Sequence, residues 1–178
     1  MQKSRWWLLS LLVVAAFAAV AVAQDKKPAS PPGEATVTFA DGKTVAIQYS
    51  RPSVRGRKIF GGLVPYDQVW RTGANSATSL KTDVALTIAG ASVPAGSYTL
   101  YTLPGMNSWK LIINKQTGQW GTEYDQGQDL ARVDMKVTQR PSGVELFTIS
   151  FDKTGSNSAT LKLEWENTIA TVEVKEKK

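Results

Sequence analysis

The feature that most constrains the fold of this chain is a succession of short runs in which apolar and polar side chains alternate. Along residues 131–137, apolar side chains stand at every odd position and charged ones at every even position. Successive side chains of a strand point to opposite sides, so a period of two indicates a β-strand with one buried face. No window after the first 23 residues has the period of an amphipathic helix. We therefore predict an all-β protein.

Residues typical of turns separate these runs. Asp41-Gly42 is a strong hairpin signal, and Pro104-Gly105 ends a later run. Pro94-Ala95-Gly96 and Pro141-Ser142-Gly143 also predict tight turns. The candidate strands are residues 35–39, 44–50, 77–80, 84–88, 97–103, 109–114, 130–137, 144–151, 159–165 and 167–174. Their regular spacing predicts an antiparallel β-sandwich or barrel of about ten short strands.

The first residues resemble a secretory signal peptide. Lys3 and Arg5 precede an apolar run over residues 6–22, and Ala21-Val22-Ala23 forms a small-x-small cleavage site. We predict cleavage after Ala23, although a run of this length also lies near the lower limit for a membrane anchor. The predicted organisation is a signal peptide (1–23), a flexible leader (24–34), one β-rich domain (35–174) and a charged tail (175–178). A mature chain without a membrane span would be periplasmic or secreted.

The composition excludes several kinds of chemistry. The chain contains no cysteine and no histidine. Nucleophile systems that need histidine, and the usual zinc, copper and non-haem iron sites, are therefore ruled out. No cofactor or metal is expected, and a non-enzymatic role is favoured. Loss of Lys3 and Arg5 would lower the formal charge from +6 to +4. We do not expect nucleic acid to be a partner of an exported chain with so mild an excess.

The long stretch from Arg51 to Asn75 interrupts the β pattern. It contains four arginines and Lys58, two prolines and a Gly-Gly pair. Arginine binds carboxylate and phosphate with two parallel hydrogen bonds, so this stretch could form an anion pocket. The candidate ligand-binding residues are Arg55, Arg57, Tyr66, Trp70, Arg71, Asn75 and Trp120. Two alternatives remain open: the arginines pair with acids on other strands, or the stretch plugs the core and buries Phe60, Leu63, Val64 and Trp70.

Several motifs in and beyond this stretch resemble one family. RGRKIFG at 55–61, LVPY at 63–66 and VWRTGAN at 69–75 are similar to the signature of a bacterial exported family catalogued as domain of unknown function 2911. PAGSY at 94–98, QWG at 119–121, FTISF at 147–151 and LEW at 163–165 agree with it. The resemblance implies an exported β-rich domain and carries no mechanism. Family members often have glycine in place of Asp67 and glutamate in place of Ser76.

Two functions remain open at this point. The first is a non-enzymatic binding or structural module of the cell envelope, in which residues 51–75 and 116–128 lie together and grip an anionic or glycan ligand. An envelope protein is a further candidate partner. The second is a carboxylate-dependent hydrolase acting on envelope polysaccharide, for which the candidate acids are Asp67, Glu123, Asp125 and Asp129. The hydrolase requires two carboxyl groups facing one cleft at roughly 5 to 10 Å.

Overall fold

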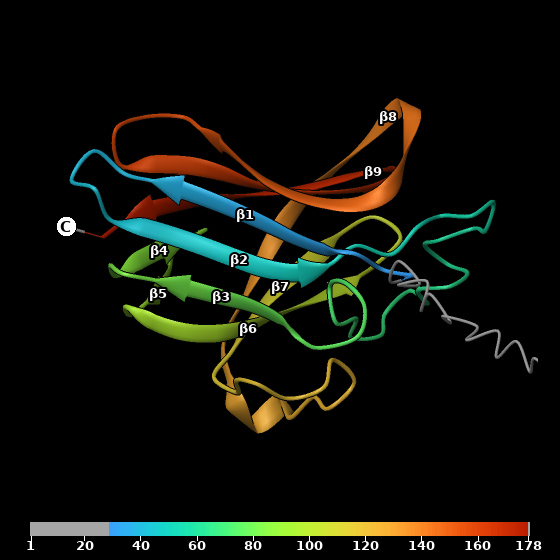
Figure 1. Ribbon diagram of the computed structural model, residues 1–178, viewed down its shortest axis with the longest axis horizontal. Coiled ribbons are helices and arrows are strands. Elements are labelled where there is room, and N and C mark those ends of the chain that lie inside the picture. Colours follow the sequence, from blue (N-terminus) through green and yellow to red (C-terminus); the bar gives the residue numbers. More distant parts are fainter. Residues whose placement is uncertain (1–28, 178) are drawn as a thin grey trace, which may run out of the picture.

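The structure is a computed structural model that describes residues 29–177 (Figure 1). The predicted signal peptide and Lys178 lie outside the described residues. The strands are β1 (Pro32–Thr38), β2 (Thr44–Ser50), β3 (Thr78–Thr82), β4 (Leu86–Ile88), β5 (Ala91–Val93), β6 (Gly96–Pro104), β7 (Trp109–Asn114), β8 (Asp129–Lys153) and β9 (Ser158–Glu176). A single 3-10 turn, η1 (Gln126–Gln128), precedes β8. The prediction of an all-β protein is confirmed for this part of the chain.

The strands form one antiparallel sheet in the order β1-β2-β3-β6-β7-β8-β9-β4-β5. β1 and β5 are its two edges, and they do not pair with each other. The predicted closed barrel is therefore wrong, because no ladder joins the ends of the sheet. The two separate sheets of a sandwich are not formed either, since the long β8 belongs to both halves of one curved sheet. Its first part pairs with β7 and the rest pairs with β9 (Figure 1).

β8 and β9 replace four of the predicted strands. Pro141-Ser142-Gly143 was expected to turn the chain, but it lies inside β8, where the strand bends (Figure 1). The pairing of β8 with β9 shifts register on both sides of Val144. Val144 lies opposite Glu166, which has a positive φ of 52°. Both strands therefore bend at the same level and stay paired across the bend, so the proline and glycine there mark a β-bulge and no hairpin.

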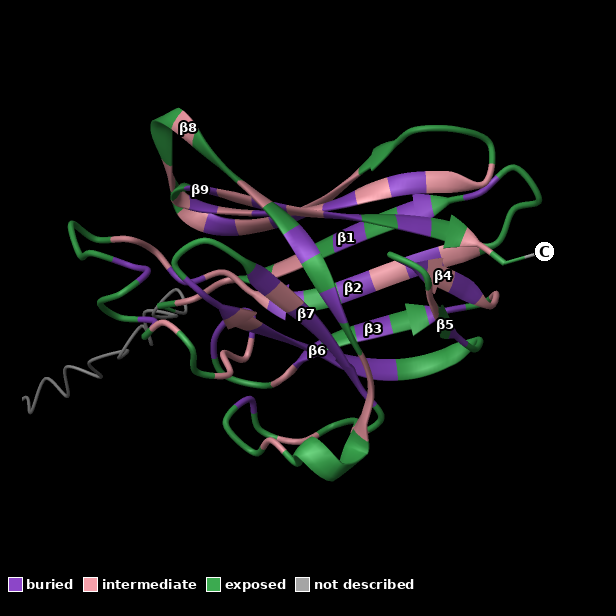
Figure 2. Ribbon diagram, turned by 180° about the vertical axis from the view of Figure 1, so that it is seen from behind, coloured by how far each residue is buried: buried purple, intermediate pink, exposed green. Residues whose placement is uncertain are grey.

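The core lies between the two halves of the curved sheet. Buried residues of β2, β3, β6 and β7 form one cluster with those of β4, β8 and β9. Figure 2 shows buried and exposed residues alternating along the strands, as the period of two predicts. Tyr49 at the end of β2 links the halves, because its hydroxyl accepts from Ile149 N at 2.8 Å and its ring lies 5.7 Å from that of Phe147.

Other expectations agree with the structure in part. The Asp41-Gly42 hairpin joins β1 to β2, and the strand expected over 109–114 is β7. β1 begins at Pro32, inside the segment expected to be leader, and β9 continues to Glu176. The described part of the chain has no helix with the length and apolarity that crossing a bilayer requires.

Candidate functional site

The stretch between β2 and β3 is fixed to the sheet at two points. Ser53 bridges Leu146 of β8, and Trp70 bridges Thr102 of β6. At the start of the stretch, the Arg51 guanidinium donates to Phe147 O at 3.1 Å and to Thr148 Oγ1 at 2.9 Å. Arg51 therefore serves the fold. The stretch is therefore an ordered part of the domain, anchored to the sheet before its tip at Ser53 and after it at Trp70.

The inner face of the stretch belongs to the core. Phe60 and Val64 are buried, as the core-plug hypothesis predicts, while Leu63 is 48% exposed, contrary to that prediction. Trp70 is partly buried. Its ring stacks on Trp165 with centroids 5.6 Å apart and meets the edge of Phe147 at 5.0 Å. Trp70 is therefore mainly a packing residue, although one part of it reaches the surface.

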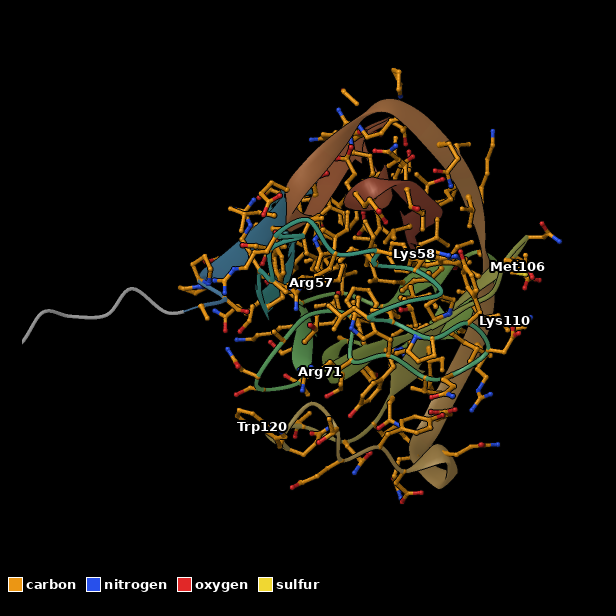
Figure 3. All side chains as sticks on the ribbon, turned by 90° about the vertical axis from the view of Figure 1, so that its right-hand side faces the viewer. Arg57, Lys58, Arg71, Met106, Lys110 and Trp120 are labelled. Carbon is orange, nitrogen blue, oxygen red and sulfur yellow. The ribbon has the colours of Figure 1, made fainter. Side chains whose placement is uncertain are left out.

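A second irregular stretch, residues 116–128, lies against the stretch at 51–75, as expected. Ser76 bridges Trp120, and Gly121 N donates to Asn75 O at 3.1 Å. The buried Asn114 holds the base of the second stretch, because its side-chain amide donates to Asp125 O at 2.8 Å and its carbonyl accepts from Gln116 N at 2.9 Å. Two stretches that are distant in sequence thus form one loop end of the molecule, which Figure 3 views directly.

A cleft of about 490 Å³ opens at this end. It brings together five of the seven predicted ligand-binding residues, namely Arg55, Arg57, Trp70, Arg71 and Asn75. Tyr66 and Trp120 are not among the residues that line it. Tyr66 packs over Gly61, where an added Cβ would meet its ring at 2.6 Å. Trp120 is 49% exposed beside the cleft.

Three aromatic residues of the cleft were not among the predicted site residues. Tyr101 of β6 and Tyr124 of the second stretch meet edge to face at 4.8 Å, and Trp165 of β9 also lines the cleft. In the predicted strand at 97–103, the alternation puts Tyr101 on the face opposite Tyr98, which is a weak signal for a side chain outside the main core. Trp165 ends the predicted strand at 159–165 and shares a face with Leu161 and Leu163, and it is buried in the structure. Only the folding of β9 shows that it lies at the edge of the core beside the cleft.

The guanidinium groups of the cleft arginines form no ion pair, although the backbone N of Arg55 donates to Glu145 Oε1 at 2.9 Å. Among residues 29–177 all ion pairs lie within β7, β8 and β9. The Arg57 guanidinium donates to Ser53 O at 2.6 Å, and that of Arg55 to Ala29 O at 3.2 Å. Neutral carbonyls orient a guanidinium without cancelling its charge. The hypothesis that these arginines pair with acids of other strands is therefore wrong within the described residues.

None of the described residues that line the cleft carries a carboxyl group. Asp129 is the acid tied most firmly to this region, and its carboxylate is engaged: it accepts from Tyr124 Oη at 2.6 Å and from Arg132 Nε at 2.8 Å. Asp67 lies in a turn where its backbone N donates to Pro104 O. The arrangement of two facing carboxylates that the hydrolase hypothesis requires is not present in the cleft as residues 29–177 form it.

Tyr124 lies in the wall of the cleft as a neutral phenol. Burial raises the pKa of Tyr124 to about 12, and the hydrogen bond to Asp129 acts in the same direction. Its hydroxyl also accepts from Arg132 at 2.6 Å. Since its hydroxyl is occupied on the side of Asp129, Tyr124 contributes mainly a ring to the cleft.

Two left-handed residues shape the segment at 71–75. Thr72 has a φ of 53° and Asn75 a φ of 58°. A β-branched residue is a true outlier in this region. Thr72 is held there because its hydroxyl lies 3.2 Å from that of Thr102 and its carbonyl accepts from Thr78 Oγ1 at 2.8 Å. Backbone strain that the surroundings maintain in this way is typical of ligand-binding sites.

The comparisons with known proteins place the chain in one family only. Neither the curated proteins nor the solved structures gave a match. The motifs at 55–75 had predicted membership of the family of domains of unknown function 2911. Residues 30–174 match that family, and the chain belongs to the family described as "Protein of unknown function (DUF2911)".

Proposed function

We propose that this protein is an exported, non-enzymatic binding module of the cell envelope, and that its cleft takes an anionic ligand. The observation that carries the proposal is a cleft lined by Arg55, Arg57 and Arg71, whose guanidinium groups form no ion pair with an acid of residues 29–177. Positive charges that lie in one cleft without counter-charges repel one another. An anionic ligand relieves this repulsion and accepts charge-assisted hydrogen bonds from the guanidinium groups.

The aromatic lining supports an occupant that also has a ring or an apolar face. The partly exposed rings of Trp70 and Tyr124 line the cleft beside the arginines, and the fully buried Tyr101 supports the ring of Tyr124 from behind at 4.8 Å. Aromatic side chains bury large apolar areas and stack on planar or sugar rings. A small organic anion or an acidic sugar combines both properties, and a neutral glycan would leave the three charges unused.

The compartment is part of the proposal. The signal-like residues 1–23 support export. An anionic glycan or metabolite of the envelope would then be available to the cleft.

The test is a thermal-shift series on the protein expressed from its full coding sequence, using glucuronate, glucose 6-phosphate and citrate beside neutral glucose. A ligand that binds only the native state stabilises it by about 2.7 kcal/mol at 100 times its dissociation constant. We expect at least one anion to raise the melting temperature and glucose to leave it unchanged.

Two matched variants locate the effect. Arg55→Gln removes one exposed charge from the cleft, and Lys136→Gln removes one exposed charge from β8, away from it. We expect Arg55→Gln to weaken anion binding about 3- to 10-fold, the effect of one charge-assisted hydrogen bond near the surface. Lys136→Gln should bind like the parent. Equal shifts with glucose and with the anions, or equal losses in both variants, would contradict an anion site in the cleft.

A further inference from the structure

The 71–75 segment has a run of backbone N–H groups with no acceptor. In the hydrogen bonding of residues 29–177, the N–H groups of Arg71, Thr72, Gly73, Ala74 and Asn75 donate to no carbonyl and to no side chain. Thr72 is fully buried, Gly73 is buried and Ala74 is only 7% exposed, whereas Arg71 is partly buried and Asn75 is exposed. Buried backbone N–H groups are almost always paired in native proteins, so a run of unpaired ones needs an explanation.

The directions of two of these groups follow from their peptide planes. The structure has no cis peptide bond among the described residues, and in a trans peptide the N–H points opposite to the C=O. The carbonyl of Thr72 accepts from Thr78 Oγ1 in β3, so the N–H of Gly73 points away from β3. The carbonyl of Trp70 accepts from Thr102 N in β6, so the N–H of Arg71 points away from β6.

The signs of φ at residues 71–72 and 74–75 agree with those of an anion-binding nest, with Gly73 between the two pairs at a φ of 158°. Arg71 and Ala74 are not among the residues with positive φ, whereas Thr72 and Asn75, which follow them, are. Successive N–H groups across such a change of sign form a concavity that binds anions. Gly73 lies against the sheet, where an added Cβ would meet Ser50 O and Thr78 Oγ1 at 3.0 Å. The donors are therefore held in a fixed position.

The side chain of Arg71 completes the group of donors. Its Nε lies 3.4 Å from Gly73 O, and its two terminal nitrogens have no partner among the described residues. Its stem packs on Gly121, where an added Cβ would lie 2.6 Å from Arg71 Cδ. Figure 3 shows Arg71 and Arg57 at the loop end, on the side where Trp120 also lies. The terminal nitrogens of Arg71 are thus free for an oxyanion. The N–H of Ala74 points away from Arg71 Nε, since Gly73 O accepts from that nitrogen, so the donors that remain available beside the fork are those of residues 71–73.

We propose that the 71–75 segment is a phosphate cradle, and that the ligand of the cleft carries a phosphate monoester. This inference rests on the proposed function and narrows its ligand class. A carboxylate offers two oxygens in one plane, whereas a phosphate monoester offers three terminal oxygens and about −1.5 to −2 charges at neutral pH. Two backbone directions, one guanidinium fork and three positive charges match the tetrahedral group better than the planar one.

The test is an amide NMR titration of the ¹⁵N-labelled protein, expressed from its full coding sequence, with inorganic phosphate, glucose 6-phosphate and glucuronate in turn. We expect glucose 6-phosphate to bind and to move the amide protons of residues 71–73 downfield, because an N–H that gains an anionic acceptor is deshielded. Inorganic phosphate should move the same amides at higher concentration, since it lacks the sugar that the aromatic wall can contact. Equal affinity for both would identify free phosphate as the ligand and would still support the cradle.

Variants of Arg71 show whether the fork takes part. Arg71→Gln is expected to weaken binding of glucose 6-phosphate about 10- to 100-fold, the range for a hydrogen-bonded charge. Arg71→Lys should keep part of the affinity because it keeps the charge and loses the fork. Lys136→Gln is the control and should leave the affinity unchanged.

The outcomes separate this inference from the proposed function. Binding of glucuronate without binding of either phosphate would overturn the cradle and leave an anion site in the cleft. Phosphate binding that moves no amide of residues 71–73 would also overturn the cradle, since the phosphate would then sit elsewhere. Failure of every anion of both classes to bind would overturn the cradle and the anion-binding function together.

Discussion

At the scale of single residues, the cleft depends on glycines that have no side chain and so let two loops approach closely. Gly121 is the clearest example. A Cβ at this position would lie 2.6 Å from Arg71 Cδ and 2.7 Å from the backbone oxygen of Asn75. A flexible side chain could move aside, but the backbone of Asn75 is fixed by its hydrogen bond from Gly121 N. The glycine is therefore required for the two loops to meet.

Replacement of Gly121 by alanine should separate the loops. We expect Gly121→Ala to lower the free energy of unfolding by about 1–3 kcal/mol, the usual cost of overpacking. It should also weaken ligand binding, because the stem of Arg71 must shift. Urea unfolding and a ligand titration on the same variant measure the two effects.

Gly127 offers a control in the same loop. It is exposed, and an added Cβ would come near only the side chain of Asp125, at 3.1 Å. Gly127→Ala should change the free energy of unfolding by no more than about 0.5 kcal/mol, as is usual at the surface. Equal stability of the two alanine variants would show that the close approach at Gly121 relaxes without cost.

Asp67 occupies a turn position with a left-handed backbone. Its φ is 58°, and this left-handed region suits glycine best. Aspartate is one of the few other residues that tolerate it. The sequence alone had raised a possible catalytic role for Asp67, because an isolated acid gives no information on its backbone conformation.

At the scale of elements, the stretch between β2 and β3 has an inner face in the core and an outer face around the cleft. Phe60 lies on the inner face, with its ring centroid 4.6 Å from that of Trp109 and 6.0 Å from that of Trp70. Leu63, at the tip, lines the cleft and is half exposed. The binding and core-plug hypotheses therefore describe two faces of one element.

Truncation of a side chain to alanine should lower the free energy of unfolding by different amounts on the two faces. Phe60→Ala should lower the free energy of unfolding by about 3–5 kcal/mol, because it leaves a cavity among aromatic rings. Leu63→Ala should cost less than about 1 kcal/mol, because the side chain keeps contact with solvent in the folded protein. Thermal and urea unfolding of both variants would measure this difference. A Phe60→Ala protein as stable as the parent would contradict a core role for the stretch.

The strand pattern in the sequence predicted most of the elements but not the length of the last two. The period of two is a local property and located β2, β6 and β7 well. Pro141 and Gly143 mark a turn in most sequences, yet here β9 bends together with β8 and keeps the ladder. Whether a proline and a glycine end a strand or bend it depends on the partner strand, which a local pattern does not contain.

At the scale of the whole molecule, the cleft could be predicted only in part. The 51–75 stretch was identified because its arginines and glycines break the strand pattern, and the structure brings five of the seven candidates together. Tyr101 and Trp165 come from inside β6 and β9, and the order of strands in the sheet brings these two strands to the cleft. The absence of ion pairs at the arginines likewise depends on where every acid of residues 29–177 lies.

The compartment is a property of the whole chain and can be tested on it. If residues 1–23 are a cleaved signal, the exported protein begins at Gln24, and mass spectrometry of the soluble exported fraction should show a chain of residues 24–178. The alternative is a chain of unreduced mass in the membrane fraction, held by the apolar run at 6–22. That result would contradict cleavage and would place the cleft on an anchored protein.

Because the chain has no cysteine, its folding does not depend on the redox state of the compartment. Protein made without residues 1–23 in a reducing cytoplasm should therefore have the same melting temperature as the exported form, to within about 1 °C. The two preparations should also bind the same anion with equal affinity. A lower melting temperature for the cytoplasmic preparation would mean that export supplies something besides location, such as a ligand that remains in the cleft, and extraction of that ligand from the exported protein would then identify it directly.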